Sequence, residues 1–212
     1  MKTLLITGFD PFGGATVNPA WEAVQQLPET VGVYRLCKLQ IPTVFDDAAK
    51  IVIEKADEVR PSVILCIGQA GGRDAVTPEF VAINHRYASI ADNAGQMPQG
   101  TCINREAPAA YFATVPVRLM TEAACAEGIR ASVSYTAGTF VCNDVLFQLL
   151  HYYRNDDIRI GFIHVPYIPS QLTDSRKSMP SMPVEDIVRG LIAAISALDT
   201  PSVQPDIKEM SG

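Results

Sequence analysis

Short apolar runs alternate with segments of helical periodicity along the chain, and this pattern constrains the fold more than any other feature. Buried parallel strands read as nearly continuous hydrophobic runs, and the helices between them cover both faces of the sheet. The pattern therefore predicts an α/β fold. We expect strands at 2–7, 31–39, 63–67, 80–84, 131–136 and 159–165, and helices at 19–27, 44–59, 117–127, 142–150 and 184–198.

The length of 212 residues suits one domain with a sizeable core. We expect a single domain over 1–198, because no linker, repeat or low-complexity tract interrupts it. Residues 199–212 lose periodicity and are expected to form a flexible tail. The longest irregular stretches, 91–107 and 168–182, have a length that often covers a site or an interface.

The charge balance is acidic, with 17 Lys and Arg against 23 Asp and Glu. No basic cluster is present, so nucleic acid is not an expected partner. The first apolar run ends at Gly8, which is too early for a signal peptide, and no run approaches the roughly 18 apolar residues of a membrane span. These features predict a soluble, non-exported protein.

The five cysteines are odd in number and widely spaced, which favours reduced cytosolic thiols over a disulfide framework. There is no Cys-x-x-Cys pair, so neither a zinc ribbon nor a thioredoxin-type redox site is expected. Cys37 and Cys66 lie in strand patterns and Cys125 in a helical one, so we expect them to pack in the core. Cys102 falls in the long irregular stretch and is expected to be exposed.

Cys142 has a different context. Small residues turn the chain after the run at 131–136, and Cys142 opens the next helix. Unpaired N–H groups and the macrodipole at a helix N-terminus favour a thiolate, which makes this cysteine a candidate nucleophile. The alternative is a buried, inert thiol, which is the common fate of a free cysteine.

A nucleophilic thiol needs a base, and His164 is the best placed of three histidines. It lies at the carboxyl end of the run at 159–165, where the Cys142 turn should also lie. The alternative is a core histidine satisfied by hydrogen bonds. His151 falls inside the helix after Cys142 and is expected to pack or face solvent, and His85 could face either way.

Four other residues stand next to predicted strands. Glu79 could orient His164 or be an ordinary charge at a strand edge, and Gln69 could bind a ligand or cap a loop. Phe9 and Phe12 lie in a Gly/Pro turn after the first strand. Their rings could grip a flat apolar ligand or pin the turn onto the core.

Together these motifs closely resemble the pyroglutamyl peptidase I family, also called pyrrolidone-carboxylate peptidases, over residues 1 to 198. The resemblance rests on GFDPFGG at 8–14, NPAW at 18–21, IGQAGGR at 67–73, Glu79 with VAIN at 81–84, TAGTFVCN at 136–143 and HVPY at 164–167. It implies a three-layer α/β/α sandwich with a central twisted, mainly parallel, mixed sheet.

The resemblance also implies a function. A cysteine exopeptidase would remove N-terminal pyroglutamate from peptides through a thioester, with Cys142 as nucleophile, His164 as general base and acid, and Glu79 orienting His164. No metal ion or other cofactor is expected. Relatives are commonly cytosolic homotetramers, so a cytoplasmic homo-oligomer, tetramer or dimer, is expected. The residues implied to bind the substrate are Phe9, Phe12, Gln69 and Val141.

Four positions depart from the family pattern. Phe80 stands where a basic residue is usual, Ser89 where an arginine is common, Tyr135 for an Asn and Asp144 for a His. An Asp144 carboxylate two residues after Cys142 would slightly oppose a thiolate. Two alternatives stay open: a catalytically weakened homologue that only binds pyroglutamyl peptides, and a nucleoside phosphorylase-like enzyme on a related fold.

Overall fold

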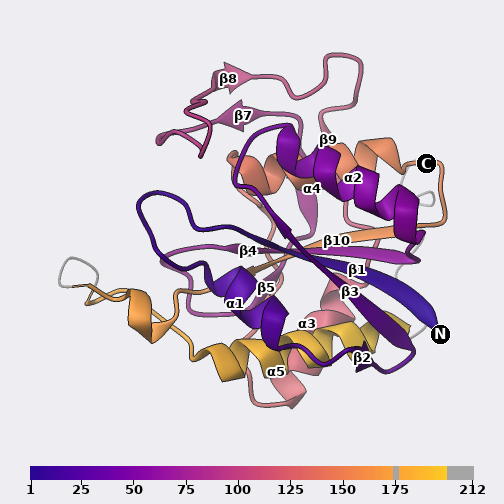
Figure 1. Ribbon diagram of the computed structural model, residues 1–212, viewed down its shortest axis with the longest axis vertical. Helices are drawn as coiled ribbons and strands as arrows, with labels where there is room; N and C mark the ends of the chain where they lie inside the picture. The colour runs from indigo at the N-terminus through magenta and orange to yellow at the C-terminus, as the bar shows by residue number, and fades with distance from the viewer. Residues whose placement is uncertain (174–176, 200–212) are drawn as a thin grey trace.

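A six-stranded sheet forms the middle layer of the computed structural model, which describes residues 1–173 and 177–199 (Figure 1). Four of its strands run parallel, and the two edge strands run antiparallel to their neighbours. The mainly parallel, mixed sheet expected from the family resemblance is thereby confirmed. In spatial order the strands are β2 (Thr30–Val31), β3 (Tyr34–Ile41), β1 (Lys2–Phe9), β4 (Val63–Gln69), β10 (Arg159–Val165) and β5 (Thr77–Pro78).

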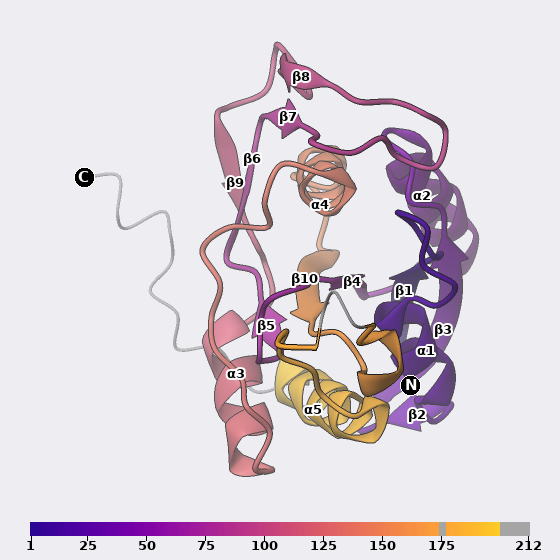
Figure 2. The same ribbon diagram turned by 90° about the vertical axis from the view of Figure 1, so that its left-hand side faces the viewer.

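Helices cover both faces of this sheet (Figure 2). Side chains on alternate positions of a strand point to opposite faces, so β1 sends Leu4 and Ile6 into one core and Leu5 and Phe9 into the other. The result is the expected three-layer sandwich. The first core lies under α1 (Pro19–Gln26), α3 (Val117–Ala126) and α5 (Val184–Ser196), and the second lies under α2 (Asp47–Val59) and α4 (Val141–Tyr152).

The register of the parallel strands brings their carboxyl ends to one edge. β10 runs beside β4 from the Arg159–Val63 pair to the Val165–Gln69 pair, and Gly8 of β1 pairs with Ile67 of β4. Ligands of open α/β sheets bind at this edge.

Helix α1 lies very close to β1. A Cβ atom at Gly8 would lie 2.8 Å from the Cα atom of Trp21, so only glycine allows this approach. The Asn18 side chain caps the helix by accepting from the Ala20 N–H at 3.1 Å, and it also donates to the Asp10 carbonyl at 2.9 Å. The turn after β1 is therefore tied to the start of α1.

Two of the strand predictions are wrong in their placement. The run at 80–84 forms β6 (Val81–Ile83), which pairs with β9 (Ala110–Phe112) in a separate two-stranded sheet. The run at 131–136 makes isolated parallel bridges, Val76 to Ala131 and Glu79 to Ser134. Pro78 of β5 offers no N–H at this edge, which limits a continuous ladder there.

Smaller differences concern turns. The run at 31–39 is a hairpin of β2 and β3, with Gly32 at φ +55° between them. The stretch at 91–107 contains β8 (Gln99–Thr101), which pairs with β7 (Arg86–Tyr87), and the stretch at 168–182 contains the 3-10 turn Pro169–Gln171. A second 3-10 turn, Ala197–Asp199, follows α5, and the rest of the expected tail lies outside the described residues. Within the described part of the chain, no helix has the length and apolar character to cross a membrane.

Candidate active site

A cavity of about 310 Å³ opens at the carboxyl edge of the sheet. Its walls come from the ends of β1, β4 and β10 and from the loop that leads into α4. Five of the seven residues named from the sequence as site residues line it: Phe9, Phe12, Gln69, Cys142 and His164.

Cys142 is the second residue of α4 and packs against Gly68 of β4. A Cβ atom at Gly68 would lie 3.0 Å from the Cys142 Sγ and 2.6 Å from the ring of Phe162. Gly68 is the register partner of His164 on β10. The thiol therefore rests on the strand position beside His164, and this requires glycine at 68.

His164 and Glu79 form a buried pair. The His164 Nδ1 lies 2.6 Å from the Glu79 Oε1, and both side chains are almost completely shielded from solvent. The same oxygen accepts from the Arg73 Nη1 at 2.7 Å. Because Oε1 is the acceptor, the network assigns the imidazole proton to Nδ1 and leaves Nε2 as the basic nitrogen.

Arg73 has a position that sequence reasoning missed. Its Nη1 also donates to the Thr77 hydroxyl at 2.6 Å, and its Nη2 donates to the Thr136 carbonyl at 2.9 Å. The guanidinium thus holds Glu79 and ties it to the loop that precedes Cys142. The one signal in the sequence was a basic residue directly after two glycines at a strand end, which by itself indicates no partner.

The thiol and the imidazole are both shifted toward their neutral forms. Burial, and then the nearby Glu79 carboxylate, raise the pKa of Cys142 to about 12. Burial lowers the pKa of His164, although the Glu79 hydrogen bond and charge oppose this. Burial therefore opposes the thiolate that the helix N-terminus was expected to favour.

Aromatic rings form the apolar wall of the cavity. Phe9 is 2 % exposed and packs 6.2 Å from Phe162, centroid to centroid, so it belongs to the core and to the cavity wall at once. Phe12 is half-buried and packs 6.1 Å from Phe140. Val141 is fully buried among core residues and does not line the cavity, so its role in substrate binding stays a prediction.

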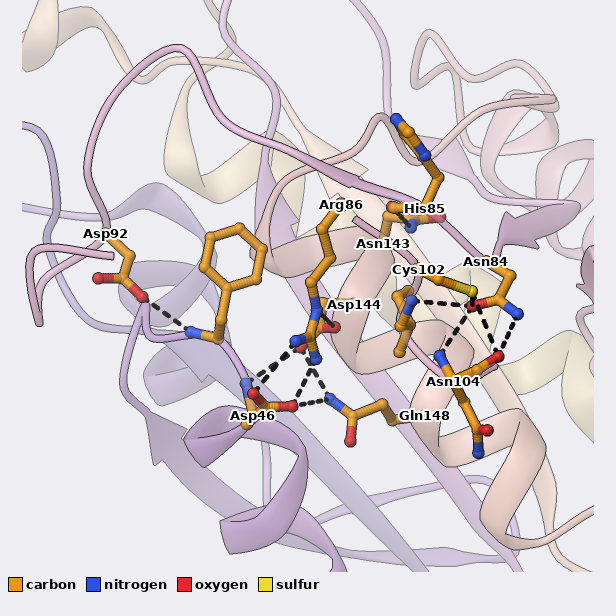
Figure 3. A network of polar contacts seen from close by, with 12 residues as sticks. Asp46, Asn84, His85, Arg86, Asp92, Cys102, Asn104, Asn143, Asp144 and Gln148 are labelled. Atoms are coloured by element: carbon orange, nitrogen blue, oxygen red, sulfur yellow. Dashed lines mark hydrogen bonds and ion pairs between the residues drawn. The ribbon is translucent and has the colours of Figure 1, made fainter. Parts of the chain in front are cut away.

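Asp144 belongs to a polar network with Arg86, Asp46 and Gln148 (Figure 3). Its carboxylate pairs with the Arg86 Nε at 2.6 Å and accepts from the Asp46 N–H and from the Gln148 Nε2. Residues two apart on a helix point about 200° apart. The Asp144 charge therefore faces Arg86 instead of Cys142, and it is absent from the groups that shift the pKa of Cys142.

The other departures also lie outside the cavity. The rings of Phe80 and Tyr135 pack 5.6 Å apart, and Phe80 packs 5.1 Å from Phe112. Phe80 is half-buried and packs against the first core, and it does not line the cavity, whereas Glu79 is fully buried. Ser89 is exposed and lines a neighbouring cavity of about 500 Å³.

The remaining thiols and histidines are dispersed. Cys66 is buried as expected and Cys37 is half-buried, but Cys125 is exposed because it lies on the solvent side of α3. Cys102 is exposed, as predicted. His85 is exposed, and the His151 Nδ1 lies 2.7 Å from the Tyr111 hydroxyl. In the described ranges, no three His, Cys, Asp or Glu side chains are grouped as a metal ion would require.

Comparison with known proteins places the chain in a family. A family model described as pyroglutamyl peptidase matches residues 1–200. Pyrrolidone-carboxylate peptidase of Bacillus cereus (strain Q1) is 45% identical, over 100% of this chain and 99% of its own length. The Streptococcus suis protein of the same name is 44% identical, over 99% and 98%.

Solved structures agree with these sequence relatives. Pyroglutamyl peptidase I from Bacillus amyloliquefaciens superposes with a TM-score of 0.90 at 45% identity, covering 93% of this chain and 97% of that one. Pyrrolidone carboxyl peptidase from Thermococcus litoralis gives 0.88 at 34% identity, covering 93% of each. The chain therefore belongs to the pyroglutamyl peptidase family.

Proposed function

We propose that this chain is a cysteine exopeptidase that removes N-terminal pyroglutamate from peptides, with Cys142 as nucleophile, His164 as general base and acid, and Glu79 orienting His164. The observation that carries the proposal is one cavity in which the Cys142 thiol rests on the strand position beside an imidazole that is held by a carboxylate. Membership of the family supports the same assignment.

The cavity walls suit the proposed substrate. A pyroglutamyl residue is a neutral five-membered lactam, which lacks the charged α-ammonium of an ordinary N-terminus. Its ring matches a pocket with aromatic walls and few polar groups, here Phe9, Phe12 and Phe140 with the Gln69 amide. The Glu79 carboxylate is fully buried and held by Arg73 and His164, so it does not serve as an anchor for an ammonium group.

The chemistry begins from a neutral pair. His164 Nε2 takes the Cys142 thiol proton as Sγ attacks the carbonyl carbon that follows the lactam ring. The imidazolium that forms is stabilised by Glu79 and then gives its proton to the departing amine, which leaves a thioester on Sγ. Water, activated by Nε2, attacks the thioester and releases pyroglutamate and the free thiol.

The oxyanion of each tetrahedral intermediate faces the start of α4. The first N–H groups of a helix lack intrahelical acceptors, and Cys142 is the second residue of this helix. The backbone N–H of Cys142 is therefore the donor that we assign to the oxyanion. It lies in the same residue as the nucleophile, so the two are positioned together.

The direct test is turnover of a pyroglutamyl reporter amide beside its prolyl and glutamyl counterparts. We expect release from the pyroglutamyl compound alone, and loss of that release in Cys142→Ala. Cys102→Ala is the matched control, because it removes an exposed thiol outside the cavity and should retain full activity. Equal activity in Cys142→Ala and the wild type would sink the mechanism.

Two further measurements test the two alternatives. Thermal stabilisation by pyroglutamate without any hydrolysis would identify a binding protein, and phosphate-dependent release of a base from a nucleoside would identify a phosphorylase. The structure does not favour a phosphate site, because the guanidinium that lines the cavity is already held by Glu79, Thr77 and Thr136. The expected cytoplasmic location and homotetramer remain predictions, and size-exclusion chromatography tests the second.

A further inference from the structure

Gln171 contacts Gln69, which lines the cavity, and the proposed function does not use it. It ends the 3-10 turn after β10, and it is 7 % exposed, so its amide group is a buried polar group that must find partners. Its carbonyl Oε1 accepts from the Ile168 backbone N–H at 3.1 Å. Its Nε2 donates to the Val17 backbone carbonyl at 3.3 Å and to the Gln69 Oε1 at 2.8 Å.

The backbone partners settle which way the Gln171 amide points. A backbone N–H can only donate and a backbone carbonyl can only accept. Oε1 must therefore face Ile168, and Nε2 must face Val17. A flipped Gln171 would set two donors against each other at Ile168 and two acceptors at Val17, so this orientation is fixed by chemistry.

The polarity of Gln171 then fixes that of Gln69. The group that faces the Gln171 Nε2 has to be an acceptor, so Gln69 must turn its Oε1 toward Gln171 and its Nε2 away. Gln69 lines the cavity, and its Nε2 has no acceptor among the described protein groups. Other polar side chains of the wall are engaged: Asn18 and Thr43 donate to the Asp10 carbonyl, and Thr139 donates to Tyr87.

We infer that Gln171 is a positioning residue that sets the specificity of the site, because it makes Gln69 present a hydrogen-bond donor and never its carbonyl. This inference rests on the proposed function. A donor at this point selects a ring that carries an acceptor, which the pyroglutamyl lactam supplies through its ring carbonyl. A prolyl ring has a methylene at that place and leaves the Gln69 donor unpaired, which disfavours it.

The sharpest test replaces Gln171 by Glu, which has nearly the same shape and, when ionised, no donor. One carboxylate oxygen still accepts from Ile168, while the other no longer donates to the Val17 carbonyl and now demands a donor from Gln69. Gln69 turns over and shows its carbonyl to the cavity. We expect kcat/KM for a pyroglutamyl reporter to fall about 10- to 100-fold, mostly through KM, and the preference for pyroglutamyl over prolyl to fall by a similar factor.

Three further variants make the result specific. Gln171→Met removes the hydrogen bonds of the Gln171 amide without reversing their polarity. Gln69 can then still turn its donor toward the cavity, so the loss of kcat/KM should be smaller than in Gln171→Glu. Ser170→Glu adds a carboxylate at the neighbouring exposed position and should leave KM unchanged. In a Gln69→Met background, Gln171→Glu should add no further loss, because the group it reverses is gone.

The outcomes separate this inference from the proposed function. If the wild type does not cleave the pyroglutamyl reporter, the proposed function fails. The effect of Gln171 on Gln69 is then tested by calorimetric binding of free pyroglutamate to the same variants. Equal losses in Gln171→Glu and Gln171→Met, an unchanged KM in Gln171→Glu, or a loss that persists in the Gln69→Met background would overturn the role of Gln171. Thermal melts of each variant identify those that fail to fold.

Discussion

Gly68 is the residue at which the packing of the site is tightest. A methyl group there would lie 2.6 Å from the Phe162 ring and 3.0 Å from the Cys142 Sγ, so Gly68→Ala must displace the thiol. We expect kcat to fall about tenfold or more, because small misplacements of reacting groups are costly. Gly161→Ala is the matched control: its Cβ would crowd Val115, away from the cavity, so it should lower stability but keep kcat. Wild-type kcat in Gly68→Ala would contradict this account.

The pH profile reports on His164. Only the neutral imidazole can take the thiol proton, and burial lowers the pKa of His164 below its ordinary value of 6.5. The acid limb of kcat/KM should therefore lie below pH 6.5, with activity lost as the pH falls through that pKa. The Arg73 charge contributes to this lowering, so Arg73→Met should move the limb to higher pH.

Arg130→Met is the control for that shift. Arg130 is exposed and pairs with Asp74 at 3.4 Å, outside the cavity, so its removal should leave the limb in place. An identical limb in Arg73→Met and the wild type would show that Arg73 does not act on His164. The measurement is the full pH dependence of kcat/KM for the three proteins.

Sequence reasoning found the residues whose position follows from strand ends. Cys142 and His164 could be placed together because the carboxyl ends of parallel strands share an edge. Arg73 and Gln171 could not be found, because their roles depend on which group each donates to, and those partners lie up to 154 residues away in the chain. The upward shift of the Cys142 pKa was also out of reach, since it depends on burial.

At the scale of elements, the Arg86 network joins α2, α4 and β7. Asp144 is fully buried and Arg86 is 14% exposed at its side chain, so this ion pair is shielded from solvent. Arg86→Met would leave the Asp144 carboxylate buried without its cation and should destabilise the fold by about 3 kcal/mol. Urea unfolding at pH 7 measures the loss, and adding Asp144→Asn should recover part of it. An unchanged midpoint in Arg86→Met would contradict the role of the pair.

The elements themselves were predicted unevenly. The strands that became β1, β4 and β10 and all five helices were found, because their apolar patterns are long and the helices carry caps or breakers. The runs at 80–84 and 131–136 were assigned to the wrong place. Short apolar runs look alike whether they join the main sheet or a side ribbon, and only long-range pairing with β9 or with residues 76 and 79 decides between these.

At the scale of the whole molecule, the sheet pairs some strands that are close in the sequence and others that are far apart in it. Lys2 of β1 pairs with Tyr34 of β3, whereas Val63 of β4 pairs with Arg159 of β10, across a much longer stretch of chain. Closing a longer loop costs more entropy, so the β1–β3 pairing should form first. Pulsed hydrogen exchange during refolding should protect β1 and β3 amides before those of β10. Simultaneous protection of all three strands would contradict this order.

This strand order has a consequence for how the protein is made on the ribosome. β4 leaves the exit tunnel long before β10, so in the nascent chain one edge of this buried strand stays open and resembles a site for aggregation. β10 closes that edge and brings His164 in the same step. Growing chains therefore carry the Cys142 thiol without its base. The proposed activity can arise only after β10 has paired with the open edge of β4.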